Sequence, residues 1–385
     1  MVRRGALYTG LNVISEMIKA WIEDCVDNHP HCATSVQMTG RLPTRLLQIE
    51  KSGKSFKVKL CLSSALSPSA SYATLSHVWG SGSPMKLVNK NVLQYQQDIP
   101  IASLPQTFAD AIQLTNALGF SYLWIDSLCI IQDSTLDWEV ESTTMCDVYR
   151  GSTINIAASA SVDCNGGLFR QRNPFLVTPC MMEVSHKQKE AGAREGEPYA
   201  LLCEIACDGD PLVDEPLSRR AWAVQERILA PRTVYFTAQK VYFVCREKRL
   251  SDIDPCGLYE VSRLNHNLGN TWAINRPALG TSASELYACS KFWQRVVQQY
   301  THGQLSYESD KLVAIAGLAE HMQGKWLGPT ITYLGGLWSF DLVEGLTWRR
   351  NKTLTSLARP KVYRAPSWSW ASVEGEVEWW PDLES

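Results

Sequence analysis

The chain has 385 residues, and its 45% hydrophobic and 20% charged content is typical of a globular protein with one large or two ordinary domains. The formal net charge of −2, without a tract of lysine or arginine, gives no reason to expect nucleic acid or an anionic membrane as a partner. Twelve cysteines in a chain this long do not indicate a disulfide framework, and neither a signal peptide nor an apolar stretch of bilayer length stands out. We therefore expect a reduced, cytoplasmic protein without a membrane span, in which fourteen tryptophans form aromatic core and cleft surfaces.

The N-terminal region, residues 1–68, predicts a helix followed by two strands. Apolar residues three and four positions apart indicate an amphipathic helix and its exit within residues 1–35. Strands are expected at residues 44–50 and 56–62, on either side of a turn at residues 51–54.

Two cysteines and two histidines gather after this helix. Cys25, His29, His31 and Cys32 resemble a metal cluster at first sight. Their spacing matches no standard zinc pattern, however, and no second pair of ligands is obvious in the nearby sequence. The sequence therefore predicts packed thiols at a helix end, with no metal and no cofactor.

The middle of the chain alternates between strands and helices. Apolar runs predict strands at residues 72–79, 122–131 and 152–159, and the pattern predicts helices between them, at residues 105–118 and up to Tyr149. Such an alternation indicates a parallel α/β sheet from about residue 70 to residue 160.

Acidic residues interrupt this apolar pattern. Asp126 lies in the middle of the run at residues 122–131, so it is expected inside the fold or at a strand end. The next helix is expected to start at Ser134, which forms a capping box with Asp137. An acid placed among buried residues is costly, and such a position indicates a candidate site.

Glu141 is the acid that the helical periodicity singles out. On a helical wheel it falls on the apolar face that also carries Trp138 and Tyr149, between Val148 and Met145. A buried carboxylate is usually paired or has a raised pKa. Two interpretations stay open: a structural ion pair, for instance with Arg220 or Arg232, and a working acid or base.

A short helix at residues 220–229 repeats the pattern. Gln225 lies on its apolar face beside Trp222, and Glu226 lies at the edge of that face. An inward amide needs hydrogen-bond partners, and either Glu141 or a ligand could supply them. The alternative is a satisfied structural amide.

The remaining segments complete the predicted domain plan. We expect a core domain at residues 69–235 with a charged surface insertion near residues 187–198, and a C-terminal region at residues 236–385 that packs on the core. Further elements are expected as a hairpin at residues 233–236 and 241–245, helices at 286–300, 310–322 and 335–348, and a tryptophan-rich, strand-like tail at 363–380.

Several blocks, in this order, resemble the fungal heterokaryon-incompatibility (HET) domain. The matching blocks are residues 72–80 (YATLSHVWG), 104–112 (LPQTFADAI), 118–133 (LGFSYLWIDSLCIIQD), then Asp137, Trp138, Glu141, Met145 and Tyr149, and residues 220–233 (RAWAVQERILAPRT). Later pieces at residues 310–312, 335–338 and 364–370 resemble the region that follows the domain in many such proteins. The first block departs from the family, because His77 stands where a tyrosine is usual.

The resemblance implies an α/β fold with a parallel-sheet, TIR-like core and helical and β-hairpin additions at the C-terminal side. HET-domain proteins are associated with self/non-self recognition and cell death, and they are remotely similar to Toll/interleukin-receptor (TIR) domains. In enzymatic TIR domains a helical glutamate supports cleavage of NAD, and the corresponding residue here is Glu141. NAD is thus a candidate substrate rather than a cofactor.

Three functions are compatible with the sequence. They are an incompatibility effector that cleaves NAD or assembles with another incompatibility protein, a cofactor-free biosynthetic cyclase or pericyclase acting on a small molecule, and a non-catalytic interaction protein. The candidate catalytic residues are Glu141, His77 and Asp126, and the candidate binding residues are Ser76, Trp79, Gly80, Trp138, Trp222, Gln225 and Glu226. Ser76 and His77 are expected on opposite faces of one strand, so they cannot form a simple nucleophile–base pair.

Overall fold

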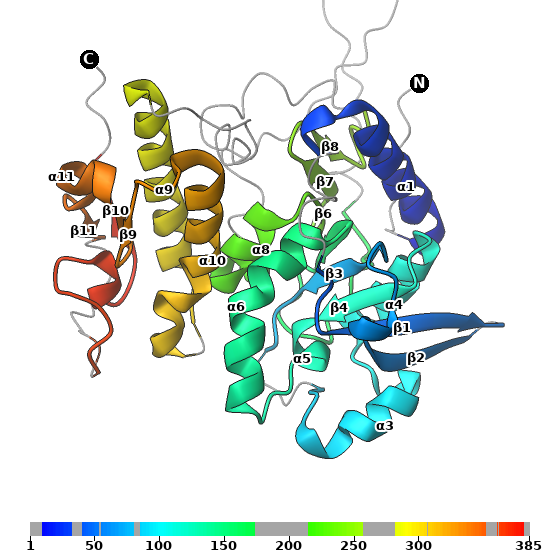
Figure 1. Cartoon of the computed structure of the whole chain (residues 1–385). Helices are drawn as coiled ribbons and strands as arrows, with labels where there is room; N and C mark the ends of the chain where they lie inside the picture. Colours follow the sequence, from blue (N-terminus) through cyan, green and yellow to red (C-terminus); the bar gives the residue numbers. More distant parts are fainter. Residues whose placement is uncertain are drawn as a thin grey trace, which may run out of the picture.

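A single large sheet dominates the computed structural model (Figure 1). The structure describes residues 10–32, 41–53, 55–80, 85–173, 215–256, 282–305, 307–351, 360 and 362–380. The insertion predicted at residues 187–198 lies outside these residues. The eight strands follow the order β2-β1-β4-β3-β5-β6-β7-β8.

Four neighbouring strands in the middle of the sheet are parallel. These are β4 (Tyr122–Ile125), β3 (Ala73–Ser76), β5 (Ile154–Ala157) and β6 (Arg232–Phe236). Nearly all of their residues are buried, because helices cover both faces of a parallel sheet. The parallel α/β sheet predicted from the sequence is confirmed.

Two crossover helices connect the first three of these strands. Helix α4 (Gln106–Ala117) joins β3 to β4, and helix α6 (Thr135–Gly151) joins β4 to β5. Gly119 closes α4 with a φ of 90°, a conformation that favours glycine at a helix end. Ser134 caps α6, since its Oγ accepts a hydrogen bond from the Asp137 backbone N–H at 3.2 Å. The reciprocal half of the predicted capping box is replaced, because the Asp137 carboxylate accepts from Arg45 and from the Ile131 N–H.

The order of these strands creates a topological switch point between β3 and β5. From β3 the chain moves to β4 on one side, and it then returns to β5 on the other side of β3. The two connections therefore leave in opposite directions and open a crevice at the carboxyl ends of β3 and β5. Open α/β sheets bind their ligands at such crevices.

The predicted strand at residues 122–131 is wrong in its second half. The strand ends at Ile125, and Asp126 begins a short helix, α5 (Asp126–Cys129). Asp126 stabilises this turn itself, because its Oδ1 accepts a hydrogen bond from the Ser127 N–H at 2.7 Å. An apolar run alone could not reveal this change of direction.

The N-terminal region extends the same sheet. Helix α1 (Leu11–Asn28) precedes the antiparallel hairpin of β1 (Arg45–Ser52) and β2 (Ser55–Leu62), as predicted. Strand β1 pairs antiparallel with β4, which makes residues 45–62 one edge of the central sheet. A small helix, α3 (Val92–Gln97), packs on β2.

At the other edge, the predicted hairpin is confirmed, and it belongs to the central sheet. Strand β6 pairs in parallel with β5, and β7 (Val241–Cys245) and β8 (Arg249–Ser251) follow antiparallel.

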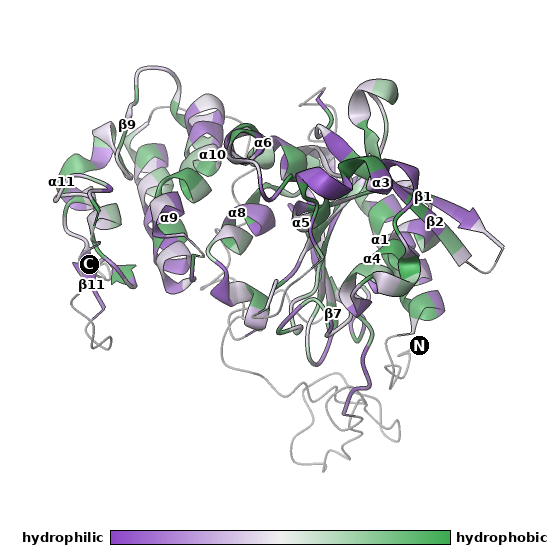
Figure 2. Ribbon diagram, turned by 90° about the horizontal axis from the view of Figure 1, so that it is seen from below, coloured by the Kyte–Doolittle hydropathy of each residue, from purple (hydrophilic) through white to green (hydrophobic). Residues whose placement is uncertain are grey.

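A helical layer separates the sheet from the C-terminal segment. It contains α8 (Trp222–Leu229), α9 (Ala283–His302) and α10 (Val313–Met322). Figures 1 and 2 show α9 and α10 between the sheet side of the molecule and the segment around α11 (Leu342–Gly345). Among the described helices, none combines the length and the apolarity that a bilayer crossing requires.

The C-terminal segment is less regular than expected. Only α11 is helical within the predicted helix at residues 335–348, apart from a 3-10 turn, and the tail contains turns rather than long strands. Its strands are two short pairs: β9 (Tyr333–Leu334) with β10 (Leu337–Trp338), and β11 (Arg349–Arg350) with β12 (Val377–Glu378).

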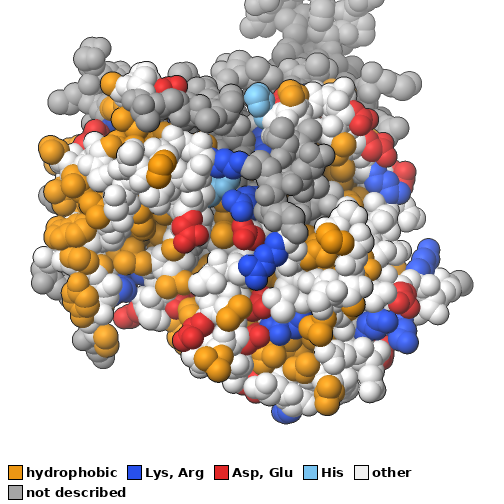
Figure 3. Space-filling model, viewed as in Figure 1, with side chains coloured by type: hydrophobic (Ala, Val, Ile, Leu, Met, Phe, Trp, Pro, Cys, Tyr) orange, Lys and Arg blue, Asp and Glu red, His pale blue; other side chains and the backbone are white. Residues whose placement is uncertain are grey.

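Tryptophans form the core of this segment, as the composition predicted. Trp338 and Trp370 of the segment are buried together with Trp293 of α9, and the Nε1–H groups of Trp293 and Trp370 both donate to the Gly336 carbonyl at 2.8 Å. Hydrophobic side chains also gather on the outer surface over this segment (Figure 3). The exposed ones include Val343, Leu346, Val362, Tyr363, Trp368 and Trp380.

Candidate functional site

A pocket of about 300 Å³ opens at the switch point of the sheet. Its floor contains Ser76 at the end of β3 together with Asn155 and Ala157 of β5. One wall comes from α8 and another from α9, while Tyr235 of β6 and the turn at residues 215–218 complete the lining. We call this the switch-point pocket.

The floor of the pocket is held by a buried hydrogen-bond network. The Asn155 Oδ1 accepts hydrogen bonds from Thr74 Oγ1 at 3.0 Å and from Ser76 Oγ at 3.1 Å. All three side chains are buried, so the network fixes the Ser76 hydroxyl at the base of the pocket.

A buried carboxyl lies behind Ser76. Glu226 of α8 is 3% exposed, and its Oε2 has no hydrogen-bond partner among the described residues. Burial raises the pKa of Glu226, and the charge of Arg220 and the hydroxyls of Ser76 and Tyr149 only partly oppose this shift. The carboxyl is therefore poised to act as a proton donor at higher pH than an ordinary glutamate.

Arg220 connects this carboxyl to a second acid. It contacts Asp126, with 3.4 Å between Nη2 and Oδ2, and donates through Nη1 to the His77 carbonyl. Asp126 also accepts from Trp79 Nε1 at 2.9 Å. A cation between two carboxyls lowers their mutual repulsion, so Arg220 holds the polar cluster together.

His77 directly follows Ser76, the last residue of β3, and does not line the pocket. Its ring packs edge-on against Phe108 of α4, with centroids 4.9 Å apart, and its Nδ1 lies 3.7 Å from Asp126 Oδ1. Burial lowers the pKa of His77 to about 4, although the Asp126 charge opposes the shift. His77 is thus a neutral, fully buried side chain near neutral pH.

Glu141 belongs to a different cluster. It is 3% exposed, which confirms that it points inward, and its Oε1 lies 3.3 Å from Arg45 Nη2. The same guanidinium contacts Asp137 at 2.5 Å and donates to the Cys129 carbonyl at 2.7 Å. The cation beside Glu141 is therefore Arg45 of β1, and neither Arg220 nor Arg232 takes that place.

Burial also raises the pKa of Glu141, against the opposing effects of the Thr44 hydroxyl and the Arg45 charge. A perturbed pKa thus occurs in both clusters. It does not by itself tell a reactive carboxyl from a structural one.

The remaining candidate residues belong neither to the polar cluster around Arg220 nor to the ion pair of Glu141. Gln225 is buried with its Oε1 beside Gly317 of α10 and Cys146 of α6, and no hydrogen bond joins it to Glu141. Gly80 has a φ of 78° and lies against Asp163, so a side chain there would clash. Trp138 and Trp222 are half-buried.

Of the ten predicted site residues, all of which the structure describes, Ser76 lines the pocket. The structure brings Ser76, His77, Trp79, Asp126 and Glu226 into one polar cluster around Arg220. Glu141 and Trp138 on α6, and Gln225 and Trp222 on α8, do not line the pocket.

Several pocket residues escaped the sequence reasoning. Arg227 of α8 donates through Nη2 to Gln299 Oε1 of α9 at 3.1 Å, and His302 Nδ1 lies 3.7 Å from Glu376 Oε2. Arg227 follows Glu226 directly and could have been inferred from the helix. His302 and Glu376 come from distant segments, and no sequence signal joins them to the switch point.

The match to a known family covers the middle of this structure. Residues 72–226 match the family described as Heterokaryon incompatibility protein (HET). The chain carries a heterokaryon-incompatibility domain. Among curated proteins and among solved structures, none matches the chain.

The HET domain holds β3 to β5 and the start of α8 as far as Glu226, and with them Ser76, Asn155 and the polar cluster around Arg220. The family supports a heterokaryon-incompatibility type of function. The α9 wall of the pocket and Glu376 lie outside the matched residues. The switch-point pocket is therefore built jointly by the HET domain and the C-terminal region.

Proposed function

We propose that this protein is an incompatibility effector whose HET domain binds a small molecule in the switch-point pocket. The candidate substrate is NAD, cleaved by water at the nicotinamide ribosyl bond to give nicotinamide, ADP-ribose and a proton. The position of the pocket carries the proposal, because the crevice beyond the carboxyl ends of β3 and β5 is where an open α/β sheet binds ligands.

One cation in the lining suits a phosphate-containing ligand. The Arg227 guanidinium of α8 can bind phosphate oxygens in a bidentate manner, beside the acidic lining residues Glu215 and Glu376. The pocket volume of about 300 Å³ is at the small end for ligand sites. It would hold the nicotinamide and ribose end of NAD, with the phosphates at the rim.

Ser76 and Glu226 have the chemistry to support bond cleavage at this place. The Ser76 hydroxyl faces the pocket and would contact a ribose hydroxyl, and the buried Glu226 carboxyl stands behind it as a positioning residue. Glycosidic cleavage develops positive charge on the sugar, which a nearby carboxyl can stabilise through such hydroxyl contacts. Glu141, which is paired with Arg45, has no role in this proposal.

A second candidate function rests on the apolar part of the lining. Ala157, Leu217, Ala223 and Val224 form a hydrophobic side of the pocket. A cofactor-free cyclase or pericyclase needs a shaped apolar cavity with one or two polar groups, and Ser76 and Arg227 could supply them.

The deciding experiment fills the pocket. Ala223→Trp places an indole in the cavity, and Val140→Trp places the same indole on the exposed face of α6 as a matched control. We expect the wild-type chain to release nicotinamide from NAD. The rate should fall at least about tenfold in Ala223→Trp and stay unchanged in Val140→Trp. Nicotinamide is measured by chromatography.

A wild-type protein that neither binds nor cleaves NAD would contradict the proposal. Retention in the pocket of an uncharged apolar ligand, lost in Ala223→Trp, would then favour the cyclase. A wild-type protein that neither cleaves NAD nor retains an apolar ligand would favour a non-catalytic interaction protein, in which the polar cluster only stabilises the fold.

A further inference from the structure

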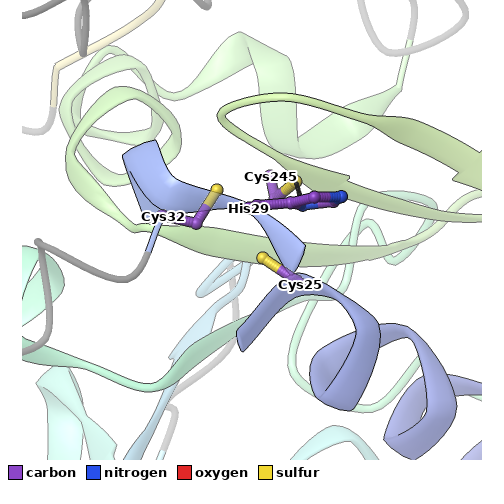
Figure 4. A group of neighbouring side chains, drawn as sticks. All are labelled: Cys25, His29, Cys32 and Cys245. Carbon is purple, nitrogen blue, oxygen red and sulfur yellow. Dashed lines mark hydrogen bonds between the residues drawn. The ribbon is translucent and has the colours of Figure 1, made fainter. Parts of the chain in front are cut away.

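Three cysteines and one histidine meet at the end of α1, far from the switch-point pocket. They are Cys25, His29, Cys32 and Cys245, and all four are buried. Their ligand atoms lie within 4.8 Å of one another, and Figure 4 shows the side chains converging from the end of α1, the turn after it and the end of β7. The residue that completes the set, Cys245, lies 216 positions after His29.

We propose that Cys25, His29, Cys32 and Cys245 form a structural zinc site. Three thiolates and one imidazole are a common ligand set for tetrahedral structural zinc. Zn–S bonds of about 2.3 Å place neighbouring ligand atoms roughly 3.8 Å apart, so a small inward movement of the four side chains completes the geometry. The site lies outside residues 72–226, which match the HET family.

His29 is oriented as a metal ligand would be. Its Nδ1 points to the cluster, 3.3 Å from Cys245 Sγ, and its Nε2 points to Asp24, 3.6 Å from Oδ2. Zinc-binding histidines usually donate their second ring N–H to a carboxylate, which fixes the ring and makes it a stronger ligand. Asp24 is itself held by Lys248, whose Nζ lies 2.9 Å from Oδ2.

The surroundings of the sulfur atoms suit thiolates. Arg232 is completely buried and donates through Nε to Cys25 Sγ at 3.1 Å, and no carboxylate pairs with it among the described residues. The backbone N–H groups of Glu247 and Lys248 point to Cys245 Sγ at 3.5 and 3.2 Å. Hydrogen bonds to an anion favour the ionised form, and metal binding requires thiolates.

A zinc ion would also balance the charge of the cluster once the thiols ionise. Three thiolates packed this closely would otherwise repel one another strongly in a buried site. A Zn²⁺ ion leaves one negative charge on the group, which the buried guanidinium of Arg232 can neutralise. All four coordination positions would come from the protein, and a closed site of this kind is structural rather than catalytic.

The site would connect the N-terminal helix α1 to strand β7 of the sheet. Helix α1 packs against β7, where Trp21 stacks near Phe243 with ring centroids 5.7 Å apart, and Trp21 Nε1 donates to the Pro255 carbonyl at 3.1 Å. A zinc ion would fasten the end of α1 to the β7–β8 turn. This arrangement explains why a sequence with no second nearby ligand pair can still hold a metal.

Elemental analysis of the full chain, purified without added metal or chelator, tests the site directly. We expect about one zinc per chain, and cobalt in place of zinc should give the visible and charge-transfer bands of a tetrahedral thiolate site. Cys32→Ser and Cys245→Ser should lose the metal. Cys289→Ser removes a buried thiol of α9 outside the cluster and should retain it.

Because the cysteine variants could lose the metal simply by failing to fold, a second test uses a variant that keeps all four ligands. Asp24→Asn should weaken zinc binding about 10- to 100-fold in a chelator competition, whereas Lys248→Gln, which breaks the same ion pair without touching His29, should change it much less. A folded protein with less than roughly a tenth of a zinc per chain and no cobalt spectrum would overturn the proposal, as would a disulfide within the cluster in the intact mass.

Discussion

Two buried glutamates, Glu141 of α6 and Glu226 of α8, are alike in burial and in the direction of their pKa shifts, and they differ in their partners. Each lies on the inner side of an amphipathic helix, is 3% exposed and has a pKa raised by burial. Arg45 pairs with Glu141 at 3.3 Å, away from any lining residue of the switch-point pocket. Glu226 lies behind Ser76, which forms the pocket floor. What separates the two residues is therefore the partner and the cavity rather than burial or pKa.

The largest effect is expected when Glu141 loses its ion-pair partner. Arg45→Ala leaves the buried Glu141 and the half-buried Asp137 without this cation, and it should lower the free energy of unfolding by about 3–5 kcal/mol. Urea denaturation followed by circular dichroism measures the loss.

Lys59→Ala, which breaks an exposed ion pair with Glu50, is the control and should change stability by less than about 1 kcal/mol. A similar small loss for Arg45→Ala would mean that the cluster around Glu141 is not a structural ion pair. The acid would then return as a candidate for function.

The next prediction concerns acid stability and His77. Its pKa of about 4 in the fold lies below the ordinary value of 6.5, so the folded state binds this proton less readily than the unfolded state does. The neutral ring stabilises the fold fully above pH 6.5, and about 3 kcal/mol is lost as the pH falls to 4.

His77→Phe should therefore flatten the fall in unfolding free energy between pH 6.5 and 4. His321 has a pKa lowered to about 4 in the same direction, because of burial and then Arg150, so a slope from that residue should remain. An unchanged slope in His77→Phe would show that His77 is accessible to protons in the fold, which would make it available for proton transfer.

The third prediction compares the two glutamates in the proposed reaction. Glu226→Gln should lower the rate of nicotinamide release about tenfold, because the amide cannot carry the negative charge that acts through Ser76 on the developing positive charge of the sugar. Glu141→Gln should leave that rate within about a factor of two. Steady-state rates against NAD concentration measure both variants.

Opposite results would return the reactive role to Glu141, as the TIR resemblance implies. Equal rates in both variants and in the wild type would remove both carboxyls from the chemistry. The pH profile adds a second check, since the raised pKa of Glu226 should make its protonated form persist to higher pH in the wild type only.

Local patterns in the sequence predicted the elements but not the partners. Alternation of strands and helices gave the parallel sheet, and helical periodicity placed Glu141 and Gln225 inside. Periodicity reports only which side of a helix is buried. Arg45 reaches Glu141 from a strand 96 positions earlier, and no spacing rule connects such residues.

The same limit explains the two sites. The pocket needs His302 and Glu376 from the C-terminal side, and the cysteine cluster needs Cys245 from the end of β7. In both sites some of the residues are close together in the sequence, whereas the others come from distant segments that the fold places beside them. A motif search confined to neighbouring residues cannot find either group.

The smallest expected effect concerns the N-terminal ends of α6 and α8. Ser134 caps α6 and orders the backbone at Asp137, whereas α8 begins at Trp222 without a side-chain cap. Ser134→Ala should cost about 1 kcal/mol of unfolding free energy, measured by urea denaturation. Because the cap lies next to the cluster around Arg45 and away from the pocket, NAD cleavage should not change. A loss of activity in Ser134→Ala at full folding would instead tie the start of α6 to function and erase the distinction between the two glutamates.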